Sequence, residues 1–270
     1  RRDSDWPYGR IAYHFQYKPA DHDQGEKTFL GETGNFNGED IIRLICQQES
    51  TARFISRHLY HFFVKDEPPI PSWKEIPPND ESAIEILVRS YFDNDHNISQ
   101  MLVDLFNSDF FKSQSIRFQR VKSPTEFVVS LLRITGECDV PNRMMFSRQQ
   151  QVGLMGQILN NPPSVEGWHE GEEWINTGTL VERINFVSEQ FGDTETPRLN
   201  QIIREITATC RDNPPSEVLI QDCLDNLGFL SVCESTMLAL TKYANEIEKP
   251  KQKISGLLRL IATSKEYQLA

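Results

Sequence analysis

The sequence predicts an all-α fold, an irregular multi-helix globular domain that follows a loop-rich N-terminal stretch. Apolar residues recur at helical spacing from residue 39 onward, capping signals precede several of these runs, and no series of strands follows residue 38. The 270 residues are enough to bury a substantial core. We expect a loop-rich segment over 1–38 that continues from a missing N-terminal part, and a helical domain over 39–270 with sub-units 39–135 and 136–270.

The first elements follow from local pattern. Aromatic and polar residues alternate over residues 13–17, which predicts a short strand, and residues 21–38 have the glycine content and low periodicity of a loop. Apolar residues then recur at helical spacing over 41–45 and again over 54–63, which predicts two helices. The pattern breaks at residues 50–51, where a serine and a threonine can cap the second helix.

Proline and capping signals divide the rest of the chain. Five prolines between residues 67 and 79 predict a linker or a surface excursion, after which Asp80 opens a helix that runs to about Phe92. The sequence Ser-Pro-Thr-Glu from residue 123 combines a serine cap, a proline in the first turn and the glutamate of a capping box. The sequence from Ser231 to Glu234 repeats this device. Further helices are predicted over residues 143–159, 179–191, 199–211, 217–227 and 254–263.

Two segments of the chain match each other at one constant offset. Each reads as a short amphipathic helix, then a serine, then an aromatic residue. The matching residues are Ile98, Ser99, Met101, Leu102, Leu105, Ser108 and Phe111 in the first segment and Ile254, Ser255, Leu257, Leu258, Ile261, Ser264 and Tyr267 in the second. A duplicated helical unit explains the match, and so does coincidence among short helices.

Charge and composition exclude some partners. The net charge of −11 and the absence of a lysine or arginine run argue against nucleic acid, because phosphate binding requires a basic face. No apolar run approaches the roughly 20 residues that span a bilayer, so we expect no membrane insertion. The five cysteines are an odd number without Cys-x-x-Cys spacing, and most lie in apolar helical patterns. Small buried side chains are favoured over a disulfide framework.

An N-terminal loop concentrates ionisable residues. His22 and Asp23 have the chemistry of divalent-metal ligands or of a proton-transfer pair, and Lys27 lies close by in the sequence. The alternative, which we favour, is a polar turn in which Asp21 accepts backbone hydrogen bonds and Lys27 is solvated. A phosphate-binding P-loop is excluded, because Glu26 and Asp21 stand where that motif requires glycine.

Two histidines and an acidic turn offer weaker candidates. His58 and His61 lie three residues apart on a predicted helix and share a face, which suits a metal pair. Half-burial beside aromatic residues is the favoured interpretation. The acidic stretch over 93–97 resembles the start of a calcium loop but lacks its glycine and distal glutamate. We therefore predict a turn that ends a helix.

Residues 161–183 form the most distinctive stretch, with two adjacent prolines, two tryptophans and several carboxylates. Trp168 and Trp174, with Glu166 beside them, suit a sugar platform flanked by carboxylates. Alternatively, Trp168 fills the core beneath the proline turn while Asn176 and Thr177 cap the helix that starts near Thr179, and we favour this structural role. The candidate residues are thus His22, Asp23, Lys27 and Glu166 for catalysis, Trp168, Trp174 and Asn176 for ligand binding, and His22 and Asp23 for a metal. No residue identifies a cofactor.

A set of landmark residues recurs along nearly the whole chain. They are His22, Asp23, Gly25, Lys27–Gly31, Thr33–Phe36, Gly38, Asp40, Ala52–Ile55, Leu59, Phe62–Val64, Val121–Pro124, Glu126, Met155–Gln157, Pro162, Pro163, Val165, Gly167, Trp168, Gly171, Trp174–Thr177, Arg183, Leu257, Leu258, Tyr267 and Gln268. In these residues and their order, the chain resembles a large bacterial family known as domain of unknown function 1800 (DUF 1800).

The resemblance implies an absent N-terminal part of the same protein, export to the periplasm or the exterior, and a sulfatase-like partner. It supplies no activity, no cofactor and no catalytic residue. Two functions therefore stay open. The first is a binding or scaffold module for a protein partner or a polysaccharide. The second is a hydrolase of a carbohydrate or related polymer, metal-dependent if the loop at His22 and Asp23 holds an ion.

Overall fold

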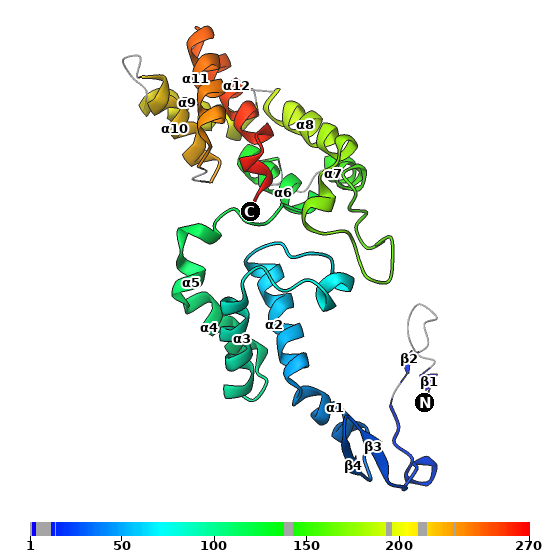
Figure 1. The fold of residues 1–270 in the computed structure, drawn as a ribbon. Coiled ribbons are helices and arrows are strands. Elements are labelled where there is room, and N and C mark those ends of the chain that lie inside the picture. Colours follow the sequence, from blue (N-terminus) through cyan, green and yellow to red (C-terminus); the bar gives the residue numbers. More distant parts are fainter. Residues whose placement is uncertain are drawn as a thin grey trace. The chain divides into compact units, whose positions relative to one another are not determined.

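The computed structural model describes the side chains of residues 15–137, 143–192, 196–208, 215–228 and 231–270, and the backbone of 2–3, 12–13 and 209. Within this part of the chain, twelve α-helices and two short hairpins confirm the all-α prediction (Figure 1). The chain divides into two compact units, Arg1–Ile55 and Ser56–Ala270. The predicted boundaries at residues 38 and 135 stay predictions.

The first unit contains strands that the sequence pattern missed in part. β1 (Arg2–Asp3) pairs with β2 (Ala12–Tyr13), and β3 (Lys27–Phe29) pairs antiparallel with β4 (Glu32–Gly34). Among the described residues of the strand predicted over 13–17, only Tyr13 belongs to a strand. The loop predicted over 21–38 contains the second hairpin. Leu30 and Gly31 make its turn with φ of 50° and 86°. A turn of this primed type is usually predicted from an Asn-Gly pair, and the sequence has Leu-Gly at this position.

Two helices complete the first unit and lead into the second. α1 (Gly38–Cys46) begins with a capping box between Asn37 and Asp40. α2 (Glu49–Phe63) begins before Ser50 and Thr51, so the prediction that one of them caps it is wrong. The hydroxyl of Thr51 instead donates to the carbonyl of Ile45 at 2.7 Å, which ties the start of α2 to α1.

The second unit opens with a small helical layer. The second half of α2 is followed by η2 (Ile70–Lys74), α3 (Glu81–Asp93), α4 (Ile98–Asn107), α5 (Asp109–Lys112) and η3 (Gln114–Ile116). Asp80 caps α3 as predicted, with its carboxylate accepting the amide of Ala83. Asn94 ends α3, so the acidic stretch is the predicted turn. Buried Leu87 and Met101 lie on α3 and α4, which pack together.

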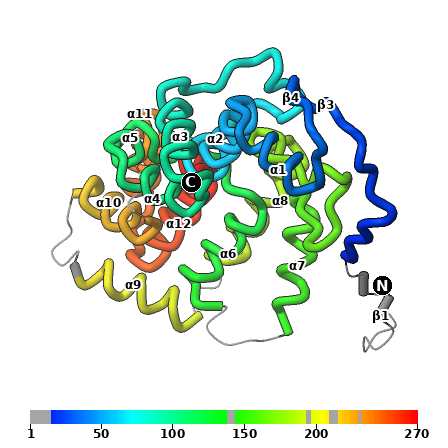
Figure 2. The backbone as a smooth tube through the Cα atoms, turned by 90° about the horizontal axis from the view of Figure 1, so that it is seen from below, coloured from blue at the N-terminus to red at the C-terminus, as the bar shows by residue number. Residues whose placement is uncertain are grey.

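The larger core of the second unit surrounds α12 (Pro250–Thr263), which contacts helices before and after it in the chain (Figure 2). The remaining elements are α6 (Pro124–Thr135), α7 (Met144–Leu154), η4 (Gly171–Trp174), α8 (Thr177–Gly192), α9 (Pro197–Thr209), α10 (Ser216–Asn226), α11 (Glu234–Glu246) and η5 (Glu266–Gln268). Helix α7 ends earlier than predicted, near Gly156, whose φ of 105° does not suit a helix. The other predicted helices agree within about two to four residues, the usual uncertainty of boundaries.

Capping and cysteine predictions have mixed outcomes. Ser123 forms the predicted capping box with Glu126. Cys233, rather than Ser231, is the N-cap of α11, so the second device is not a serine cap. Cys223 is buried as predicted, whereas Cys46 and Cys233 are only partly buried. The other two cysteines, at positions 138 and 210, lie outside the described residues.

The two matching segments share a local geometry. Ser108 follows α4 and Ser264 follows α12, each with extended backbone and with its amide donating to the carbonyl three residues earlier. Each hydroxyl then accepts the amide of the aromatic residue three positions later, Phe111 or Tyr267. The common motif is a serine that ends one helix and caps the turn that follows it. Duplication of a helical unit stays a hypothesis.

A buried arginine joins the last segment to the middle of the second unit. Arg183 on α8 is fully buried and donates to the carbonyl of Lys122 at 2.8 Å and to the Gln268 side chain at 3.1 Å. Val121 bridges Leu269 in an antiparallel contact beside it. Burial lowers the pKa of Lys122 to about 8, and its ammonium donates to the carbonyl of Tyr267. The C-terminal residues are thus part of the core.

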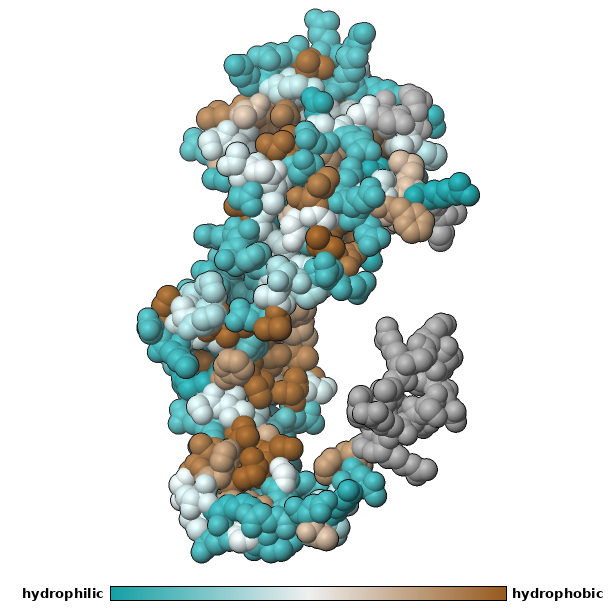
Figure 3. All heavy atoms as spheres, turned by 90° about the vertical axis from the view of Figure 1, so that its right-hand side faces the viewer, coloured by the Kyte–Doolittle hydropathy of each residue, from teal (hydrophilic) through white to brown (hydrophobic). Residues whose placement is uncertain are grey.

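The described surface is partly apolar and carries no membrane-spanning helix. Apolar residues show as brown patches on the face drawn in Figure 3. In the second unit, Phe62 and Phe106 are exposed, and each lies edge-on to Phe63, with ring centroids 4.7 and 5.2 Å apart. Among the described helices, none combines the length and the apolar character that a membrane crossing requires.

Candidate functional site

The segment between α7 and α8, residues 155–176, is the shaped loop that its composition predicts. Gly156, Gly167 and Gly171 all have positive φ, and a bridge between Ser164 and Gly167 closes a tight turn. Val165 at the tip of this turn is fully exposed. Left-handed backbone at these positions suits glycine, which explains why the loop needs so many of them.

The two tryptophans of this loop have different roles. Trp174 is only 5% exposed and lies against the backbone of Gly156, where an added methyl would be 3.7 Å from its ring. Trp168 is partly exposed, and its indole N–H donates to the carbonyl of Ile158 at 3.0 Å. Trp174, rather than Trp168, therefore fills the core, and Trp168 keeps part of its ring on the surface in a fixed orientation.

Asn176 acts as a cap. Its side-chain oxygen accepts the amides of Gly178 and Thr179 at 3.0 and 3.1 Å, which confirms the predicted start of the helix now labelled α8. Thr177 lies inside the helix rather than before it. The ligand-binding role predicted for Asn176 stays a prediction.

The loop reaches α2 through a histidine–glutamate contact. The Nε2 of His61 lies 2.5 Å from the Oε2 of Glu170, and the Nδ1 of His61 accepts the amide of Glu67 at 2.9 Å. Because Nδ1 is an acceptor, the neutral ring carries its proton on Nε2 and donates it to Glu170. Both ring nitrogens are occupied, so His61 positions Glu170 and has no lone pair for a substrate.

His58 confirms the favoured interpretation of the histidine pair. Its partly buried ring lies 4.7 Å from that of Trp73, and burial is the main reason why its pKa is lowered. Trp73 belongs to the proline-rich segment over 67–79. That segment is a surface excursion anchored to α2 rather than a free linker, because Arg57 donates hydrogen bonds to the carbonyls of Ile76 and Pro77.

Asp66 lies beside the contact between His61 and Glu170. Its carboxylate accepts the amide of Val121 at 2.7 Å, and a methyl added at Gly171 would be 3.2 Å from its carboxyl carbon. Burial raises the pKa of Asp66, whereas the hydrogen bond from His61 is the main cause that lowers the pKa of Glu170. Two neighbouring carboxyl groups therefore differ in proton affinity, as an acid–base pair requires.

The N-terminal loop forms its own hydrogen-bonded turn in the first unit. The carboxylate of Asp23 accepts the amide of Gly25 at 2.8 Å, and the ammonium of Lys27 donates to the carbonyls of Asp23 and Gly25. Asp23 rather than Asp21 thus accepts the backbone amide, and Lys27 is bound to carbonyls instead of being solvated. This supports the polar-turn interpretation, with different residues in the roles.

His22 has a different environment. Its ring lies 5.7 Å from that of Tyr17, and its Nδ1 has no hydrogen-bond partner among the described residues. No group of three His, Cys, Asp or Glu side chains in the described residues is arranged to hold a metal ion. His22, Asp23 and Lys27 belong to the first unit and Glu166 and Trp168 to the second. A site shared between them stays a prediction.

Sequence reasoning missed Asp66 and the role of Glu170. His61 was singled out, but its partner lies 109 residues away in the chain and no spacing links them. Asp66 had no local signal at all, since it precedes the prolines as one of many acidic residues. Only Gly171, one of the landmark residues of the family resemblance, indicates that another segment lies close to the backbone of the loop. That segment contains Asp66.

Comparison with known proteins gives one match. Residues 6–269 match the model of a family described as a protein of unknown function, DUF1800. No curated protein matches the chain. No solved structure matches it either. The family description assigns no role to any residue of the site.

Proposed function

Since the chain belongs to the DUF1800 family, whose description names no function, we propose one from the site alone. The protein is a non-catalytic binding module that holds a neutral polysaccharide against Trp168. The export and the sulfatase-like partner that the resemblance implies stay predictions, and this proposal does not depend on them. The observation that carries it is the partly exposed, hydrogen-bonded indole of Trp168.

The geometry of Trp168 supports a stacking role. An indole combines a large apolar face with one polar N–H, and here the carbonyl of Ile158 occupies that N–H. The ring is therefore oriented before a ligand arrives, which lowers the entropic cost of binding. A sugar ring presents an apolar face of C–H groups that fits such a platform.

The charge around Trp168 favours a neutral polymer. Glu166, Glu170, Glu172 and Glu173 are exposed in the same loop, and their carboxylates accept hydrogen bonds from sugar hydroxyls. The same carboxylates repel an anionic polymer, and the net charge of −11 adds to this repulsion. A neutral glucan or xylan is thus favoured over a uronate or a sulfated polymer.

We predict that Trp168→Ala weakens binding to a neutral polysaccharide by about tenfold or more, the change that corresponds to about 1.4 kcal/mol. Affinity electrophoresis in gels containing soluble glucan or xylan measures this directly, and a gel containing pectin, a uronate polymer, is the anionic comparison in which we expect weaker retardation. Trp168→Phe is the matched control, since it keeps an aromatic face and loses only the bond to Ile158. We expect it to retain intermediate affinity.

Two results contradict the proposal. If the mobility of the wild-type protein is the same with and without each neutral polysaccharide, the protein does not bind such polymers. Equal retardation of wild type and Trp168→Ala moves the binding surface elsewhere. The melting temperature of each variant shows whether lost binding comes from lost folding.

The pair Asp66 and Glu170 favours a second function, hydrolysis of the bound polymer. Asp66, with its raised pKa, is the candidate acid, and Glu170, with its lowered pKa, is the candidate base or nucleophile. Glu170 is exposed in the same loop as Trp168, so a chain stacked on Trp168 can reach it.

In that case Glu170→Gln lowers the release of reducing ends by about 100-fold or more, the range of general acid–base catalysis. The same variant keeps most of its affinity in the gels, because Trp168 is unchanged and the amide oxygen of glutamine still accepts hydrogen bonds. Wild-type protein that binds a polymer without cleaving it eliminates hydrolysis and leaves the binding module.

A further inference from the structure

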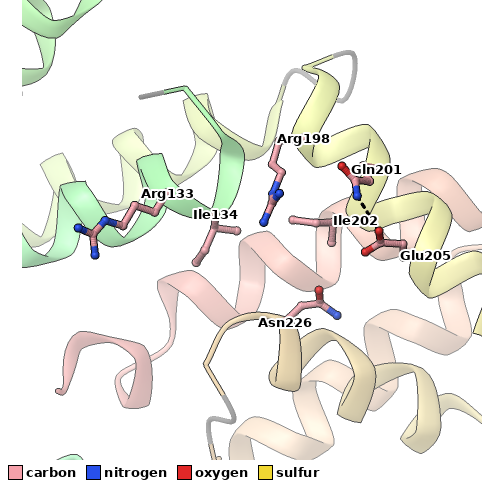
Figure 4. A pocket seen from close by; sticks show the side chains of 7 residues that line it. All are labelled: Arg133, Ile134, Arg198, Gln201, Ile202, Glu205 and Asn226. Atoms are coloured by element: carbon pink, nitrogen blue, oxygen red, sulfur yellow. Dashed lines mark hydrogen bonds between the residues drawn. The ribbon is translucent and has the colours of Figure 1, made fainter. Parts of the chain in front are cut away.

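A hollow of about 330 Å³ lies in the second unit, at the ends of three helices. Arg133 and Ile134 from the end of α6 form one wall, and α9 and Asn226 at the end of α10 form the rest (Figure 4). From α9 come Arg198, Gln201, Ile202 and Glu205. Its volume is at the lower end of the range of small-molecule sites.

The polar groups of the hollow have distinct roles. Figure 4 shows Arg198 pointing between Ile134 and Ile202 toward Asn226, whereas the guanidinium of Arg133 turns away at the edge. The amide of Gln201 donates to the carboxylate of Glu205 at 2.8 Å. Among the described residues neither arginine forms a hydrogen bond or an ion pair. The inner cation is therefore Arg198, with an amide and two branched apolar side chains around it.

We propose that this hollow binds a small organic carboxylate with an apolar body. A guanidinium matches a carboxylate through two parallel hydrogen bonds. The side-chain nitrogen of Asn226 already donates one hydrogen to the carbonyl of Asp222 at 2.8 Å, and its second hydrogen adds a further donor. The isoleucines contact the apolar part of the ligand. Two arginines against one glutamate make the hollow locally positive in a protein of net charge −11, so the cations mark a site for an anion. This site is independent of Trp168.

The test uses 4-fluorobenzoate as probe and 4-fluorobenzamide as its neutral counterpart, both observed by fluorine NMR on the full chain. We expect the acid to bind. The amide binds more weakly by about tenfold or more, because it is neutral and cannot form the charge-assisted pair of hydrogen bonds with the guanidinium. Arg198→Gln weakens binding of the acid to the level of the amide.

Two further variants locate the site. Arg133→Gln, at the edge, weakens binding of the acid by only about twofold, as expected of a more distant and hydrated charge. Arg204→Gln on the same helix is the matched control, because Arg204 is exposed and lies outside the hollow. It leaves the affinity unchanged.

The proposal is overturned by an acid signal that shows no line broadening, by equal binding of acid and amide, or by unchanged affinity in Arg198→Gln. A loss of binding in Arg204→Gln equal to that in Arg198→Gln also overturns it, since the effect is then one of overall charge. Melting temperatures confirm that each variant is folded. All the substituted residues are exposed, so folding is expected to persist.

Discussion

Glu67→Ala is expected to lower the free energy of unfolding by about 3–5 kcal/mol, the cost of leaving a buried charge without its partner. The side chains of Glu67 and Arg57 are 0% and 7% exposed, and two nitrogens of Arg57 donate to the same carboxylate oxygen at 2.6 and 2.8 Å. The other oxygen accepts the amide of Asn79. Removal of this carboxylate strands a guanidinium and a backbone donor together.

Urea denaturation followed by circular dichroism measures this effect. Glu246→Ala is the control, because the pair Lys242–Glu246 is an exposed contact at 4.0 Å on one helix. Exposed pairs of that kind contribute about 0.3–0.5 kcal/mol. If Glu67→Ala loses no more free energy of unfolding than Glu246→Ala, then Arg57 is hydrated in solution. In that case the ion pair does not anchor the proline-rich segment.

Trp174→Ala is expected to cost about 3–5 kcal/mol, the range for removal of a large buried aromatic side chain. The ring is 5% exposed, so its loss leaves a cavity beneath Gly156. The carbonyl of Trp174 also accepts the hydroxyl of Thr179 and thus connects the loop to α8. Thermal unfolding followed by circular dichroism is the measurement.

Trp168→Ala is the matched comparison in the same loop. It removes a ring of the same size that is partly exposed, so we expect a clearly smaller loss of stability. Equal losses in both variants contradict the division of roles between the two tryptophans. They also remove the main argument that Trp168 is available to a ligand.

The elements that the sequence predicted correctly depend on neighbours within a few residues. Asp80 and Ser123 cap their helices because a short polar side chain reaches the amide three residues later, whatever surrounds it. The apolar residues at helical spacing over 254–263 likewise predict a helix with a buried face, which is part of α12. These signals are sufficient for an all-α fold and for most of its helices.

Where local alternatives have similar energies, the sequence predicted less well. The turn at Leu30 and Gly31 requires positive φ at a leucine, which the hairpin supports through its cross-strand hydrogen bonds. Cys233 takes the cap position in place of Ser231, and its amide donates to the carboxylate of Glu266, 33 residues later. In both cases the deciding interaction lies outside the four-residue pattern that was read.

The sequence by itself determined the helical class, the capping positions at Asp80 and Ser123, and the shaped loop around its glycines. Only the tertiary structure decided which tryptophan is buried, and that Asp66, His61 and Glu170 meet. It also decided that Arg198 points into a hollow at three helix ends. The physical reason is that burial, pKa and charge pairing depend on distances between segments far apart in the chain, which no spacing along the sequence encodes.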